Sequence, residues 1–80
     1  MTQDQAVQIV QAKRRKLQID PEMAFESARK AVVEYKKNPD TPGPTEDRIA
    51  WIVTFSWEWG YVNVHVDERT GDILAVRRSS

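Results

Sequence analysis

The sequence predicts an α+β domain in which two N-terminal helices pack on one face of a three-stranded antiparallel meander, in the order α-α-β-β-β. Apolar residues recur at helical spacing in the first 37 residues, and the period changes to two from Ile49 onward. A segment that holds three of the four prolines separates the two parts. We therefore expect one domain, residues 1–80, with a helical part at 1–37, a proline-rich connector at 38–48 and a sheet at 49–78.

The first helix has a clear start signal. Thr2 and Gln5 are spaced as in a capping box, in which each side chain accepts a hydrogen bond from the other residue's backbone. Apolar residues then follow at helical spacing: Ala6, Ile9, Val10 and Leu17. The pattern predicts a helix from about residue 3 to about residue 16.

A second helix is expected to start at Asp20. This residue suits an N-cap, Pro21 suits the first helical position, and Glu22 lies where the helix dipole favours an acid. One apolar face is then formed by Phe25, Ala28, Val32 and Tyr35. The run of Lys36, Lys37, Asn38 and Pro39 should end the helix, because lysines suit the last turn and proline disfavours continuation.

Two alternating segments follow the connector. The first places Ile49, Trp51, Val53, Phe55 and Trp57 on one face, and the second places Val62, Val64 and Val66 on one face. Residues 58–60 form the expected turn between them. Trp51 is expected in the core, and Tyr61, Asn63 and His65 are expected on the outward face.

The third strand follows a bulged turn. Asp67 can bond the backbone of the turn, Thr70 lies within it, and Gly71 supplies the left-handed position that closes a type I turn. "ILAVRR" then predicts the last strand.

Composition limits the classes of function. The chain has no cysteine, so neither a disulfide nor a thiolate metal site can supplement the core. Twelve basic and twelve acidic residues give no net charge, which argues against a nucleic-acid partner. No segment has the apolar length of a signal peptide or a membrane span. The expectation is a small soluble cytoplasmic domain, or an exported one if a signal peptide has been removed.

The segment "VNVHVDERTGDILAVRR" resembles the end of a PepSY domain, a family that typically closes with a strand, a V-D-x-x-T-G turn and a last strand. The similarity covers mainly residues 49–77. Small bacterial immunity proteins with a V-D-x-x-T-G turn are similar over the same stretch. Both resemblances imply a binding or inhibitory module without an active site or a cofactor: PepSY domains are often attached to proteases, and immunity proteins neutralise a toxin.

Three groups of residues are candidate sites. His65 and Asp67 point to the same side of a strand, so a metal or catalytic pair is one alternative, against a solvent-facing histidine. The acids around Gly71 lack the spacing of a calcium loop, which favours a structural turn. The basic residues 13–16 point in different directions on a helix and suit its C-terminus, which favours a solvated helix end over a phosphate site.

The aromatic residues around the first β-turn give the preferred hypothesis. Trp57, Trp59 and Tyr61 cluster at a hairpin tip, and Asn63 and His65 continue along the same outward face. Tryptophan and tyrosine are favoured interface anchors, so these residues are expected to contact another protein. The alternative for Trp59 is that its ring protects the edge of the sheet. A homodimer through an edge strand is a further arrangement, and no metal or membrane contact is expected.

Overall fold

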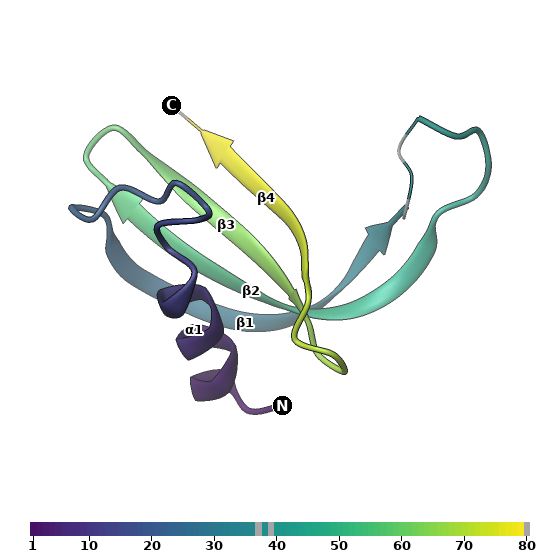
Figure 1. Ribbon diagram of the computed structural model, residues 1–80, viewed down its shortest axis with the longest axis horizontal. Helices are drawn as coiled ribbons and strands as arrows, with labels where there is room; N and C mark the ends of the chain where they lie inside the picture. Colours follow the sequence, from purple (N-terminus) through teal and green to yellow (C-terminus); the bar gives the residue numbers. More distant parts are fainter. Residues whose placement is uncertain (37, 39, 80) are drawn as a thin grey trace.

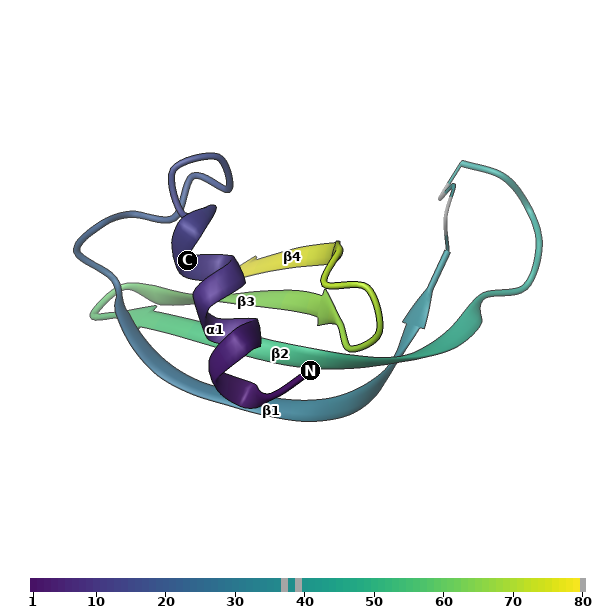
Figure 2. The same cartoon turned by 60° about the horizontal axis from the view of Figure 1, so that its bottom comes forward.

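The computed structural model describes residues 1–36, 38 and 40–79. Helix α1 (Gln3–Ala12) is followed by strands β1 (Ala24–Tyr35), β2 (Glu46–Trp57), β3 (Gly60–Asp67) and β4 (Ile73–Ser79). The strands form one antiparallel sheet in chain order, and α1 lies across one of its faces (Figures 1 and 2). The architecture is therefore α-β-β-β-β, and the expected fold with two helices and three strands is wrong.

The segment expected to be the second helix is strand β1. It pairs with β2 along its whole length, from Ala24 opposite Ser56 to Tyr35 opposite Glu46, with a bulge between Phe25 and Ser27. Hydrogen bonding to β2 overrides the local helix preference of this segment, which contains three alanines. The stop expected at Lys37 and Pro39 falls outside the described residues.

The residues that suggested an N-cap form a turn instead. The Asp20 side chain accepts a hydrogen bond from the Glu22 backbone at 2.8 Å, and the Met23 backbone donates to the Asp20 carbonyl at 3.0 Å. Aspartate followed by proline is as typical of a turn as of a helix start. The same side-chain chemistry therefore reverses the chain and leads it into β1.

The capping box of α1 is confirmed. Thr2 Oγ1 accepts from the Gln5 backbone at 3.2 Å, and Gln5 Oε1 accepts from the Thr2 backbone at 2.8 Å. The helix ends at Ala12 and not near residue 16. Turns follow, with Gln18 at a positive φ of 58°, and the Arg14 side chain donates to the carbonyls of Asp20 at 2.7 Å and Met23 at 2.8 Å. Arg14 thereby ties the loop after the helix to the start of β1.

The core lies between α1 and the middle of the sheet. The core cluster includes Ala6 and Val10 of α1 with Val53, Phe55, Val62, Val64 and Val66. The inward positions predicted for β3 are confirmed, and those predicted for β2 are confirmed only in its middle, because Ile49 is exposed. Paired residues of neighbouring strands point to the same face, so Phe55 meets Val62 and Val53 meets Val64. Trp51 is only partly buried, and Trp57, expected inward, is exposed.

The first two strands continue beyond β3 as a two-stranded ribbon. This ribbon curls away from the rest of the sheet on the right of Figure 1. Its β2 part includes residues 46–48, which had been assigned to the connector. Val32 and Ile49 are cross-strand partners here, and both remain exposed because α1 does not reach them.

Candidate functional site

Four exposed aromatic side chains gather where β1 begins and where β2 turns into β3. We call this group the aromatic end: Phe25, Trp57, Trp59 and Tyr61. Trp59 has the largest exposed fraction of the four, 72%. The tight β2–β3 hairpin, closed by the pairing of Trp57 with Gly60, holds Trp59 at its tip.

The rings of the aromatic end lie on both sides of the hairpin. Trp57 follows Phe55 by two residues, so it points to the face that carries α1, whereas Tyr61 points to the opposite face. Phe25 joins the group because β1 pairs Phe25 with Phe55, and their rings meet edge to face at 6.1 Å. The sequence had placed Phe25 on a helix, so its membership was missed.

The open face of the sheet holds the other two residues expected at a contact surface. Asn63 and His65 follow Tyr61 at alternate positions, so the three side chains point the same way along β3. Asn63 is engaged with β2, since Thr54 Oγ1 donates to Asn63 Oδ1 at 2.7 Å. The structure thus places all five expected contact residues on or next to one hairpin.

His65 is half-buried on this open face. Burial lowers the pKa of its imidazole, and the positive charges of Arg77 and Arg29 lower the pKa further. Arg29 and His65 both pair with Ile52, from opposite sides, so this aliphatic residue lies between them. A lowered pKa leaves His65 neutral at pH 7, when it can both donate and accept a hydrogen bond.

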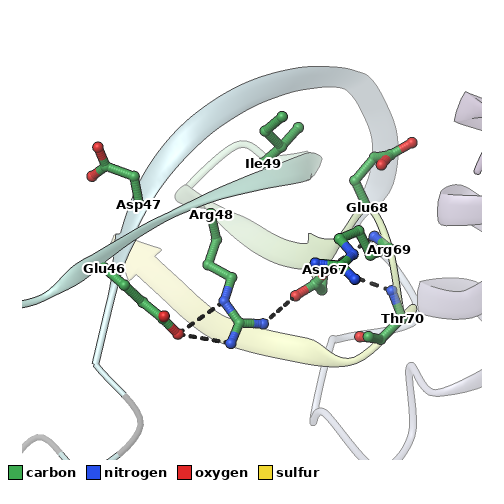
Figure 3. A pocket seen from close by; sticks show the side chains of 8 residues that line it. All are labelled: Glu46, Asp47, Arg48, Ile49, Asp67, Glu68, Arg69 and Thr70. Atoms are coloured by element: carbon green, nitrogen blue, oxygen red, sulfur yellow. Dashed lines mark hydrogen bonds and ion pairs between the residues drawn. The ribbon is translucent and has the colours of Figure 1, made fainter.

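The opposite end of β3 is polar and partly buried. We call it the fork, because β2 separates here from β3; its residues are Glu46, Arg48 and Asp67. Figure 3 shows Arg48 reaching both acids. Its Nη1 donates to Asp67 Oδ2 at 2.7 Å, and its Nε and Nη2 donate to Glu46 Oε1 at 3.0 and 2.7 Å.

Asp67 serves the turn as well as the fork. Its side chain is buried, and Oδ1 accepts from the backbones of Arg69 at 2.8 Å and Thr70 at 3.4 Å. The hydrogen bond from Arg69, together with those from Arg48 and Thr70, lowers the pKa of this carboxyl. Asp67 in turn is the main cause of the raised pKa of Arg48. Both carboxylate oxygens are therefore engaged in structural bonds.

The turn expected between β3 and β4 has Gly71 at a φ of 79°, in the left-handed region. The Gly71 backbone donates to the Asp67 carbonyl at 2.9 Å, and the Asp67 backbone donates to the Asp72 carbonyl at 2.8 Å. Thr70 Oγ1 accepts from the Asp72 backbone at 3.2 Å. Asp67, Thr70 and Gly71 thus act together in fixing the turn.

A metal or catalytic pair of His65 and Asp67 was the alternative. Asp67 uses its oxygens as described above, and no hydrogen bond joins it to His65 within the described ranges. Residues 1–36, 38 and 40–79 contain no group of three or more potential metal-ligating side chains. Arg48, which sequence reasoning missed, is the residue that the structure brings to Asp67. Its position 19 residues earlier gave no local signal.

Comparison with protein-family models, with curated proteins and with solved structures gives no match for this chain. The resemblances to PepSY domains and to small immunity proteins therefore stay predictions. Within the described part of the chain, no helix is long and apolar enough to cross a membrane.

Proposed function

We propose that this domain is a small non-enzymatic module that binds another protein through the aromatic end. The observation that carries the proposal is the exposure of four large aromatic side chains at one end of the sheet. Exposed apolar groups that lie together mark interaction sites more often than single exposed ones do, and Phe25 and Trp57 share the face that carries α1. Tryptophan and tyrosine are also the side chains that most often supply the binding energy of an interface.

The surroundings of the aromatic end suit a preorganised contact surface. The hairpin backbone is fixed by cross-strand pairing up to Trp57 and Gly60, so the rings are presented without the ordering of a long loop. Next to Tyr61, the open face offers Asn63 and a neutral His65 as polar groups. An apolar centre with polar groups at its margin is the usual composition of a protein interface.

The two family resemblances agree with a binder. A PepSY-like role would make the domain an inhibitory or binding partner of another protein, and an immunity role would make it a stoichiometric inhibitor of a toxin. Both belong to this proposal, because each requires a protein partner and neither requires an active site in this chain.

The test compares two truncations at opposite ends of the sheet. A partner is captured from a lysate of the native host on the immobilised domain, and its affinity for each variant is measured by titration. Trp59→Ala should weaken binding about thirtyfold, which corresponds to about 2 kcal/mol. Ile49→Ala, an exposed aliphatic residue of the curled ribbon, should leave the affinity unchanged. Equal affinities for the Trp59→Ala variant and the wild type would contradict the proposed surface.

A further inference from the structure

The outer edge of β1 presents unpaired backbone groups. β1 is a 12-residue strand, and β2 is its partner on one side. The other edge strand of the sheet is β4, a shorter strand of seven residues whose Arg78 side chain donates to the carbonyls of Leu17 and Gln18. Long edge strands are templates for pairing with another chain, and β1 is the longer of the two edge strands.

An exposed apolar strip reaches this edge. Val32 is 67% exposed, and its partner Ile49 on β2 is 52% exposed. Cross-strand partners point to the same face, so the two side chains form one continuous aliphatic surface on the curled ribbon. The core does not use this surface, and it lies at the far end of the sheet from the aromatic end.

Contacts of α1 indicate which backbone groups of β1 are free. Gln3 Nε2 donates to the Ala28 carbonyl at 3.2 Å, which marks this carbonyl as one directed away from β2. In an antiparallel ladder, backbone groups of alternate residues point to the same edge. Lys30, Val32 and Glu34 therefore also direct their N–H and C=O groups outward, and they follow Ala28 toward the end of β1.

We propose that two copies of this chain pair through β1, antiparallel and centred on Val32. Val32 then faces Val32 of the second copy, and Lys30 of each copy faces Glu34 of the other. The outward groups of these residues form about six new backbone hydrogen bonds. The aliphatic strip doubles across the junction, covering Val32, and the two sheets become one continuous sheet.

Charge selects this register over its neighbours. Centring on Lys30 would place Lys30 opposite Lys30 and Glu26 opposite Glu34, which is repulsive. Centring on Ala28 would use the carbonyl that Gln3 already occupies. The registers between these place a charged side chain opposite an aliphatic one. Only the register centred on Val32 combines two opposite-charge pairs with an apolar centre.

The test is a charge exchange followed by sedimentation equilibrium of the full chain. Wild type should show a concentration-dependent dimer. Glu34→Lys and Lys30→Glu should each raise the dimer dissociation constant about tenfold or more, because each makes both charge pairs repulsive. An equimolar mixture of the two variants should regain the dimer, since each 30–34 pair in the heterodimer is again of opposite charge. Glu26→Lys, on the same strand outside the pairing, is the matched control and should dimerise as wild type does.

Several outcomes would overturn the proposal. The wild type could stay monomeric at all concentrations. The Glu34→Lys variant could dimerise as tightly as the wild type, or the mixture of the two charge variants could fail to form a dimer. A dimer abolished by Trp59→Ala would move self-association to the aromatic end and also overturn it. Because the variants are mixed with each other, recovery also excludes misfolding as the reason for their dissociation.

Discussion

The two ends of β3 both depart from the usual pattern of buried apolar and exposed charged side chains, and they do so in opposite ways. At the aromatic end, large rings are exposed, and at the fork a carboxylate is buried. Neither arrangement follows from the rule that apolar groups are inside and charged groups outside. The comparison separates two roles. The fork uses its polar groups to fix strands and turn, so we expect it to govern stability, whereas we expect the exposed rings of the aromatic end to contribute less to stability and to govern binding.

The fork gives the largest expected effect. Asp67→Ala removes the carboxylate that accepts hydrogen bonds from the turn backbone and from Nη1 of Arg48. This substitution should lower the free energy of unfolding by about 3 kcal/mol. This is the lower part of the range for buried ion pairs, because Arg48 reaches solvent. Glu46→Ala, which removes the exposed partner of the same guanidinium, should cost less than about 1 kcal/mol. Urea unfolding of both variants measures the difference, and equal losses would show that burial at the fork has no energetic role.

The turn next to the fork comes second. Gly71→Val should cost about 1–3 kcal/mol, because β-branched residues tolerate a left-handed backbone poorly. A Cβ at this position would also lie 3.2 Å from Ile9 Cδ1, so the end of the Ile9 side chain would have to shift slightly. Gly71→Asn should cost less than Gly71→Val, since asparagine adopts this backbone more readily. A melting temperature unchanged by valine would remove the proposed role of the turn.

The aromatic end should contribute little to stability. Trp59→Ala is expected to lower the free energy of unfolding by about 1 kcal/mol or less, because most of its ring already contacts water. Phe55→Ala, two strand positions before Trp57 but fully buried, should cost about 3–5 kcal/mol. Thermal unfolding of the pair tests whether exposure separates their roles. A Trp59→Ala variant as unstable as Phe55→Ala would assign the ring to the fold.

The smallest effect concerns His65, between the two ends. Its folded pKa is lowered, so as pH falls below the unfolded value of about 6.5 the unfolded chain takes up the proton first. Stability therefore decreases with falling pH until the folded pKa is passed, and is fully present above the unfolded pKa. In the His65→Gln variant, the free energy of unfolding should no longer decrease over this pH window. The loss of stability that Asp67 causes, which occurs below about pH 4, should remain. A wild-type stability that does not change between pH 7 and 5 would contradict the burial of His65.

The sequence predicted secondary structure correctly where its apolar residues fitted only one type of element. Alternation along residues 49–57 and 61–67 identified both central strands and most of their inward side chains, although Ile49 and Trp57, at the two ends of the first pattern, are exposed. It misled at residues 24–35, where helix-forming composition and a cap-like Asp20 outweighed a strand signal that the bulge near Glu26 interrupts. Pairing with β2, a tertiary effect, decides this segment.

The candidate sites also divide into residues that a local pattern identifies and residues that only tertiary pairing brings together. Trp59 and Tyr61 could be assigned to a hairpin tip because the turn is local. Phe25 and Arg48 join their sites through strand pairings or side-chain bonds to residues 19 or more positions away. Such partners follow from the register of the sheet, which a single sequence does not state.

The order of the strands has a consequence for how the chain folds. Every strand pairs with its neighbour in the sequence, so the sheet can assemble by successive short loop closures, which are fast. Helix α1 is the exception, because Ala6 and Val10 find their neighbours on β2 and β3, far along the chain. During synthesis the helix leaves the ribosome before the strands and docks after they have paired. Its apolar side therefore stays uncovered until the β2–β3 hairpin forms, so the helix is made before the sheet but is protected after it.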